Sequence, residues 1–259
     1  MALRWSELAQ PQGLPLRAST SADTVVYAIG DIHGRCDLLA ELHDAIAADM
    51  AQRRERQRLI VYLGDYLSRG VDSRRVVELV CQAAPAGCRK LPLRGNHEEL
   101  MLRYLAGNFE GGRFWFDYDG VDVLENYGVS VANRQARDDR SLESLRQAFA
   151  AALPPEHLAF FRSLAVHHDE GGYRFVHAGV RPGVALAQQT EHDQVWIRKP
   201  FLDSEDDHGA VVVHGHSISG EPQVRHNRIG IDTGAYKSGI LTCLVLAGEE
   251  RRLLQAVAP

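Results

Sequence analysis

The sequence has few cysteines, and none of them forms a close pair. Cys36, Cys81, Cys88 and Cys243 are spread over 259 residues, so the spacing of a thiolate zinc site is absent. We therefore expect four reduced, mostly buried thiols, as is typical of a cytoplasmic protein.

Long hydrophobic runs are also absent. No apolar stretch approaches the roughly 20 residues that a membrane-spanning helix needs, so we expect no membrane segment. The N-terminal residues carry Arg4 and Glu7 inside their only apolar patch, unlike the core of a secretory signal. We expect residues 1–23 to form a mobile or loosely docked tail and residues 24–259 to form one domain.

Positive charge is not in excess, because 29 basic residues stand against 34 acidic ones and the formal net charge is −5. This balance argues against general nucleic-acid binding, although it leaves room for a local basic pocket. The hydrophobic fraction of 45% is that of an ordinary globular protein.

The order strand, loop, helix recurs three times in the first part of the chain. The predicted strands lie at 24–29, 59–63 and 89–93, and the helices that follow them lie at 37–50, at 73–81 and from His97 onward. This alternation predicts an α/β sheet whose loops gather at the carboxyl ends of its strands.

A different pattern fills residues 103–163, which are rich in helical periodicity and contain Pro154-Pro155 between two predicted helices. We interpret this segment as a helical cap inserted over one side of a site. Further strands are predicted beyond it and indicate a second, more antiparallel sheet. They lie at 164–168, 173–177, 194–197, 210–214, 228–231, 239–246 and 251–256.

The cap holds a short run of aromatic residues: Phe109, Phe114, Trp115, Phe116 and Tyr118. Such side chains commonly anchor an insertion on the core. The alternative is that one or two of them line the rim of the site, where they would stack on a base or grip a peptide.

Five loops place His, Asp and Asn directly after apolar runs. They read GDIHG at 30–34, GDYLSRG at 64–70, RGNHE at 94–98, VHAG at 176–179 and VHGHS at 213–217. Packing or turn chemistry explains one such loop, but five of them at predicted strand ends indicate a single polar site. Carboxylate, imidazole and amide ligands without thiolate suit Mn, Fe, Zn, Ni or Co.

These blocks resemble those of the phosphoprotein phosphatase family of calcineurin-like metallophosphoesterases, in its bacterial and phage branch, which is related to the diadenosine tetraphosphate hydrolases. The match covers about residues 25–245 and includes the motif Ile231-Asp232-Thr233-Gly234-Ala235. The resemblance implies a four-layer sandwich of two mixed β-sheets flanked by helices, in which the cap is an insertion.

The resemblance also implies two divalent metal ions, with Mn ahead of Fe, Zn, Ni and Co. Asp31 and His33 would hold the first ion, and Asp65 would bridge both. The second ion would be completed by three further side chains: Asn96, His177 and His216. His216 matches the ligand position better than His214, which we interpret as a residue at a strand end.

Three further residues match catalytic positions of the family. His97 matches the general acid for the leaving oxygen, and Arg69 and Arg198 match phosphate-binding arginines, whose planar fork suits phosphate. A solvated surface cation is the alternative for Arg198. Tyr236 either belongs to the site or packs at its rim.

Ser68 departs from the family, which has a second Asp at this position to orient the acidic histidine. A serine hydroxyl can form only a hydrogen bond, whereas a carboxylate holds an imidazolium by charge. We therefore expect the pKa of His97 to be lower here than in the usual phosphatase.

The leading functional expectation is a serine/threonine protein phosphatase that hydrolyses phosphate monoesters with a metal-activated water. The alternative is a hydrolase of dinucleoside polyphosphates, such as diadenosine tetraphosphate, or of RNA ends. The expected partners are thus a phosphorylated protein or peptide, or a small nucleotide. A catalytically inactive binding module would have lost a metal ligand, and none of the six positions is lost.

Overall fold

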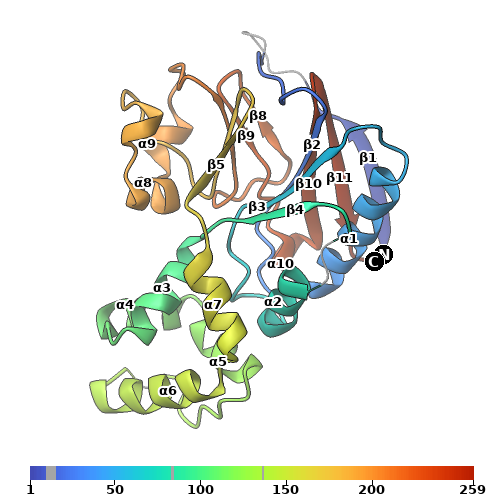
Figure 1. Cartoon of the computed structure of the whole chain (residues 1–259). Coiled ribbons are helices and arrows are strands. Elements are labelled where there is room, and N and C mark those ends of the chain that lie inside the picture. Colours follow the sequence, from blue (N-terminus) through green and yellow to red (C-terminus); the bar gives the residue numbers. More distant parts are fainter. Residues whose placement is uncertain (10–15, 83–84, 136) are drawn as a thin grey trace.

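Two β-sheets lie at the centre of the computed structural model, which describes residues 1–9, 16–82, 85–135 and 137–259 (Figure 1). The larger sheet has the strand order β1-β11-β10-β2-β3-β4. Strands β2, β3 and β4 run parallel, and the other neighbours are antiparallel. Its strands are β1 (Ala2–Glu7), β2 (Thr24–Ile29), β3 (Gln57–Tyr62), β4 (Arg89–Pro92), β10 (Ile240–Ala247) and β11 (Glu250–Val257).

The smaller sheet has the order β5-β6-β7-β9-β8. Strands β6, β7 and β9 run parallel, while β5 and β8 are antiparallel to their neighbours. Its strands are β5 (His167–Glu170), β6 (Tyr173–Val176), β7 (Val211–His214), β8 (Gln223–Val224) and β9 (Arg228–Gly230). Both sheets are therefore mixed, as the resemblance implies. The expectation of a more antiparallel second sheet is wrong, because β6, β7 and β9 pair in parallel.

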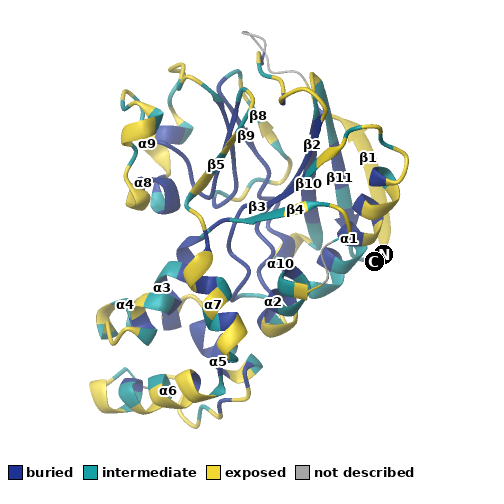
Figure 2. Cartoon of the chain, in the orientation of Figure 1, coloured by how far each residue is buried: buried dark blue, intermediate teal, exposed yellow. Residues whose placement is uncertain are grey.

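Alternate residues of β2 belong to two different cores. Val26 and Ala28 pack between the sheets against residues such as Phe175 and Val213. Val25, Tyr27 and Ile29 point to the other side, where helices cover the larger sheet. Burial on both faces explains why β2 is a nearly continuous apolar run, and it is buried along its length in Figure 2.

Helices form the outer layers. On the larger sheet lie α1 (Cys36–Met50) and α2 (Ser73–Gln82), while α8 (Glu191–Trp196) and α9 (Lys199–Leu202) cover the smaller one. A separate group of helices lies below the sheets in Figure 1. It comprises α3 (Asn96–Leu105), α4 (Phe109–Asp117), α5 (Gly120–Asn126), α6 (Asp139–Ala152) and α7 (Pro155–Ser163).

The predicted fold class, two mixed sheets flanked by helices with a helical insertion, is confirmed. The domain boundaries at 24–259 and the extent of the cap at 103–163 stay predictions. Pro155 occupies the first turn of α7, where its missing N–H costs no helical hydrogen bond.

Two predictions about the strands are wrong. Residues 194–196 form the end of α8 rather than part of a strand, and Ile197 is the residue after the helix. The Thr190 hydroxyl caps this helix by accepting a hydrogen bond from the Asp193 N–H. Such a short apolar run does not by itself distinguish strand from helix. Strands β10 and β11 join the larger sheet, not the second one, because β10 pairs with β2.

The N-terminal tail also needs correction. Ala2–Glu7 is not loosely docked but forms the edge strand β1, paired with β11 along its whole length. Leu8 and Leu16 are buried between the sheets, and residues 10–15 lie outside the described residues.

Among the described residues, none of the helices combines the length and the apolar character needed to cross a bilayer. A cytoplasmic location stays a prediction.

Candidate metal centre

The predicted site residues follow the carboxyl ends of parallel strands in both sheets. Asp31 and His33 follow β2, and Asp65 follows β3. Asn96 and His97 begin α3, shortly after β4. From the smaller sheet come two histidines, His177 after β6 and His216 after β7. Because the two sheets face each other, these ends meet at one place.

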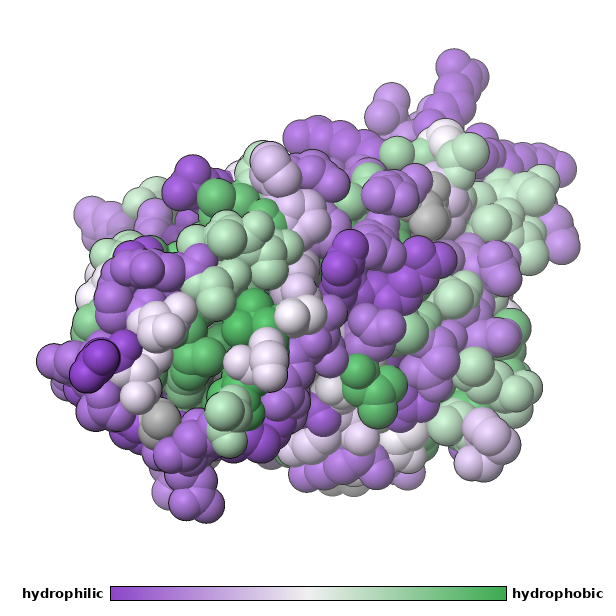
Figure 3. All heavy atoms as spheres, turned by 90° about the horizontal axis from the view of Figure 1, so that it is seen from below, coloured by the Kyte–Doolittle hydropathy of each residue, from purple (hydrophilic) through white to green (hydrophobic). Residues whose placement is uncertain are grey.

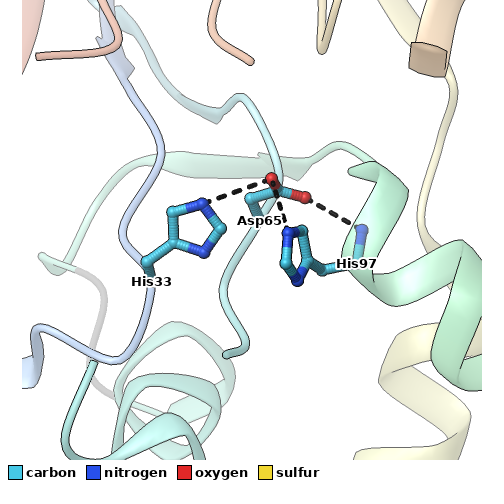
Figure 4. A group of neighbouring side chains, drawn as sticks. All are labelled: His33, Asp65 and His97. Carbon is cyan, nitrogen blue, oxygen red and sulfur yellow. Dashed lines mark hydrogen bonds and ion pairs between the residues drawn. The ribbon is translucent and has the colours of Figure 1, made fainter. Parts of the chain in front are cut away.

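The carboxylate of Asp65 is at the centre of the site (Figure 4). Its Oδ2 lies 3.4 Å from His33 Nε2 and 3.9 Å from His97 Nε2. Its Oδ1 lies 3.6 Å from His177 Nε2 and accepts a hydrogen bond from the His97 N–H. Both oxygens of one buried carboxylate thus face imidazole nitrogens on opposite sides.

Asp65 is shared by two groups of ligand atoms, each within 4.8 Å of one another. The first contains His33 and His97, and the second contains His177 and His216. Asn96 Oδ1 lies 3.0 Å from His177 Nε2 and so adjoins the second group. The sharing suits a bridging ligand, although His97, assigned from the resemblance to acid catalysis, lies within the first group.

Asp31 is tied to the site through the backbone. The His216 N–H donates a hydrogen bond of 2.9 Å to Asp31 Oδ2, and Asp31 Oδ1 is buried without a partner. His216 Nε2 is unpartnered as well. Two buried polar atoms with no hydrogen-bond partner at the same site are the kind of exception that a bound ion explains.

Backbone carbonyls orient two of the histidines. His33 Nδ1 lies 2.8 Å from the Leu67 carbonyl, and His177 Nδ1 lies 2.8 Å from the Leu63 carbonyl. Each carbonyl accepts a hydrogen bond from the Nδ1–H, so the unprotonated Nε2 faces the cluster as a possible ligand atom.

The backbone of these loops is strained. Seven non-glycine residues have a positive φ in the part of the chain that the structure describes. Five of them lie in the site loops: His33, Asp65, Ser68, Arg69 and His216. Left-handed conformations of such residues cost of order 1–3 kcal/mol each and gather where function requires a particular geometry.

Glu98 holds two site loops together, a role that the sequence analysis missed. Its buried carboxylate accepts hydrogen bonds from the backbone N–H groups of Asp65, Tyr66, Leu67 and Gly95. The only signal in the sequence was its place in the RGNHE block, which does not reveal which N–H groups come near.

The electrostatics of the site favour a bound cation. Burial raises the pKa of Asp31 well above its usual range, and the charges of Asp232 and Asp65 add to this rise. Burial likewise raises the pKa values of Asp65 and Glu98. Four carboxyl groups, including Asp232, thus share one buried region and repel each other when ionised.

The histidines complement these carboxylates only when they are neutral. Burial lowers the pKa of His33 to about 3 and that of His177 to about 4, and it also lowers the pKa values of His97 and His216. Neutral imidazoles can coordinate a metal but cannot balance negative charge. Divalent cations would supply this balance, so the residues fit the implied metals.

A cavity of about 260 Å³ opens beside the cluster. It is lined by His33, Asp65, Arg69, Asn96, His97, Arg198, His216, Ile218 and Asp232. Arg198 is exposed but lines this cavity together with Arg69, so both predicted phosphate-binding arginines face the same space. Asp232 was quoted only as part of a motif, and its place in the lining was not predicted.

Tyr236 lies at the rim and holds Arg69. Its hydroxyl accepts a hydrogen bond of 2.9 Å from Arg69 Nη1, and the guanidinium lies 5.1 Å from its ring centre. His214 is buried outside both ligand groups, with its ring edge against Phe201 at 5.1 Å.

Ser68 is fully buried, and its hydroxyl has no hydrogen-bond partner among the described residues. His97 Nδ1 is likewise buried without a partner there. No carboxylate therefore holds the far nitrogen of His97, which agrees with the missing second Asp.

The chain belongs to the calcineurin-like phosphoesterase family, whose model matches residues 24–236. Among its relatives is a protein of Bacillus thuringiensis (strain Al Hakam) named bis(5'-nucleosyl)-tetraphosphatase PrpE, asymmetrical. The two are 22% identical over 236 residues, which cover 83% of this chain and 88% of the relative. A symmetrical bis(5'-nucleosyl)-tetraphosphatase of Aromatoleum aromaticum (strain EbN1) is 28% identical over 64% of this chain and 50% of its own length.

Solved structures share the fold. A putative diadenosine tetraphosphatase superimposes with a TM-score of 0.56 at 19% identity, covering 87% of this chain and 93% of its own. A cold-active protein-tyrosine phosphatase of a Shewanella species gives a TM-score of 0.54 at 16% identity, covering 95% and 86%. Proteins named for different substrates therefore share this fold, so the likeness in fold does not select a substrate for this chain.

Proposed function

We propose that this phosphoesterase hydrolyses dinucleoside polyphosphates such as diadenosine tetraphosphate. Relatives that align over 83% of the chain carry the name bis(5'-nucleosyl)-tetraphosphatase, and their names support this alternative better than the leading expectation of a serine/threonine protein phosphatase.

The unpartnered Nδ1 of His97 is the observation that carries the proposal. A histidine that protonates a leaving alkoxide needs a carboxylate to stabilise its charged form, and Ser68 provides none. A nucleotide leaves a phosphoanhydride far more readily than an alkoxide leaves a phosphoserine, so it needs less help from an acid. The site therefore suits a nucleotide leaving group better than an alkoxide.

The proposed roles follow from the geometry. Asp65 lies between the two ligand groups, where it would bridge two divalent ions, Mn being the first candidate and Fe, Zn, Ni or Co the others. Such a pair would lower the pKa of a bound water and stabilise both the attacking and the leaving oxygen. Arg69 and Arg198 bind the phosphate charge, and His97 Nε2 donates a hydrogen bond to the leaving oxygen.

A protein phosphatase is the second candidate, favoured by the intact RGNHE block and by Arg69, which match that branch. The test compares the Mn-loaded protein on diadenosine tetraphosphate, a phosphoserine/phosphothreonine peptide and capped RNA, with chromatography of the products. We expect kcat/KM to be highest for the dinucleotide, by about tenfold or more. A preference for the peptide would contradict the proposal, and a preference for capped RNA would move it to RNA ends.

A further inference from the structure

The aromatic run of the cap divides into two sets with different surroundings. Trp115 and Phe116 are buried and pack against Tyr104 with ring centres 5.8 and 5.1 Å away, so they anchor α4 on the core. Phe114 and Tyr118 remain 44% and 40% exposed. Anchoring thus explains one set but leaves the other without a structural role.

The exposed set forms a row of rings that starts at the candidate metal centre. The ring of Tyr118 lies 6.3 Å from that of His97 and 4.8 Å from that of Phe114. Phe114 in turn lies 6.1 Å from Trp196. The Arg69 guanidinium, which faces the catalytic cavity, lies 5.9 Å from the ring centre of Tyr118.

A second cavity, of about 540 Å³, opens at the end of this row. It is lined by Leu100, Arg103, Asn108, Glu110, Gly111, Arg113, Phe114, Asp117, His192 and Trp196. Its volume lies within the roughly 300–1,000 Å³ usual for small-molecule sites, and its aromatic and polar lining is typical of them. Figure 3 shows the molecule from below, where hydrophobic residues form several patches among hydrophilic ones.

The two cavities are lined by residues that are close neighbours along the chain. His97 lines the catalytic cavity and Leu100 lines the second, three residues apart on one face of α3. Likewise, Trp196 at the end of α8 lines the second cavity, and Arg198, two residues later, lines the first. A molecule with phosphates at Arg69 and Arg198 would therefore extend directly towards Phe114.

We propose that the second cavity binds one nucleobase of a dinucleoside polyphosphate, stacked on Phe114 beside Trp196. This inference rests on the proposed function and names a base-binding subsite for it. Every nucleobase offers a flat π face, and aromatic side chains with an exposed face bind it without regard to base identity. The phosphate chain would position the base, because Arg69, which would bind the phosphates, lies beside the ring of Tyr118.

The test is calorimetric titration of the Mn-loaded full chain with ADP and with inorganic pyrophosphate. Phe114→Ala removes a side chain that is 44% exposed, so we expect the fold to stay intact. We expect this variant to bind ADP about tenfold more weakly and pyrophosphate unchanged, because only ADP carries a base. Phe114→Tyr should restore ADP binding. Trp5→Ala, an aromatic residue of β1 with 37% exposure, is the matched control and should leave both ligands unaffected.

Steady-state kinetics separate this inference from the proposed function. If wild type cleaves diadenosine tetraphosphate and Phe114→Ala keeps its KM and its ADP affinity, the base subsite is refuted while the function stands. If wild type prefers the phosphopeptide, the proposed function fails, and the ADP titration still decides whether the cavity binds a base. If Phe114→Ala loses activity on the phosphopeptide alone, the cavity binds peptide and the inference is overturned.

Discussion

The carboxylate of Glu98 accepts four backbone hydrogen bonds from the loops that carry Asp65 and Asn96. Charge-assisted bonds of this kind are about twice as strong as neutral ones, and a buried N–H that loses its acceptor keeps its full desolvation cost. The position of Asp65, the candidate bridging residue, thus depends on a residue that lines neither cavity.

We expect Glu98→Ala to lower the free energy of unfolding by about 3 kcal/mol or more, because four buried N–H groups lose their acceptor. Metal affinity should fall with it, since the Asp65 loop is released. Denaturant titration and metal binding measure the two effects. Glu110→Ala is the matched control, since this exposed glutamate should change stability by no more than about 0.5 kcal/mol. Wild-type stability in Glu98→Ala would contradict the role.

Ser68 supports a prediction about the leaving group. It adopts a φ of 69°, which Asp and Asn tolerate better than most residues, so both can be introduced here. Ser68→Asp should restore a carboxylate partner for His97 and raise hydrolysis of a phosphoserine peptide relative to p-nitrophenyl phosphate by about tenfold. Ser68→Asn, which lacks the charge, should not. An unchanged ratio in Ser68→Asp would remove the explanation offered for the substrate preference.

At this scale the sequence could predict that the candidate ligands lie at strand ends, because each stands in a short motif directly after an apolar strand; that they bind metal stays a prediction. The structure brings all six together around Asp65 or against His216. The places of Glu98 and Asp232 could not be predicted, because they depend on which backbone groups and carboxylates approach in three dimensions.

At the scale of elements, helix α8 shows most clearly what the sequence analysis could not predict. Its last residue, Trp196, lines the second cavity, and Arg198, which follows the helix, lines the cavity beside the candidate metal centre. The sequence predicted a strand at 194–197, because four residues do not reveal periodicity. The deciding signals lie upstream, in the Thr190 cap and in the Asp193 carboxylate, which pairs with Arg181.

We expect Thr190→Ala to lower the free energy of unfolding by about 1 kcal/mol, because the first turn of α8 loses its cap. It should also reduce kcat/KM several-fold, since Arg198 follows this helix directly. Thr190→Ser keeps the capping hydroxyl and should behave as wild type. Thermal unfolding and kinetics on one substrate check both effects. If the alanine variant keeps full activity despite lower stability, the helix does not position Arg198.

At the scale of the whole molecule, the site exists only because two sheets pack face to face. Asp31 and Asp65 come from one sheet and His177 and His216 from the other. The parallel strands were predictable from their continuous apolar runs. The pairing of β10 with β2, across more than 200 residues, and the pairing of β1 with β11 were not, because nothing local in the chain specifies a distant partner.

The central claim is that Asp65 bridges two divalent ions in one hydrolytic site, and metal stoichiometry tests it most directly. Elemental analysis of Mn-loaded protein should find two ions per chain in wild type. In Asp65→Asn we expect one ion or fewer and loss of hydrolysis by about a hundredfold or more, because both ions lose their shared charged ligand. The Ser68→Asn variant serves as the control and should keep two ions. An Asp65→Asn protein that retains two ions and wild-type turnover would contradict the account.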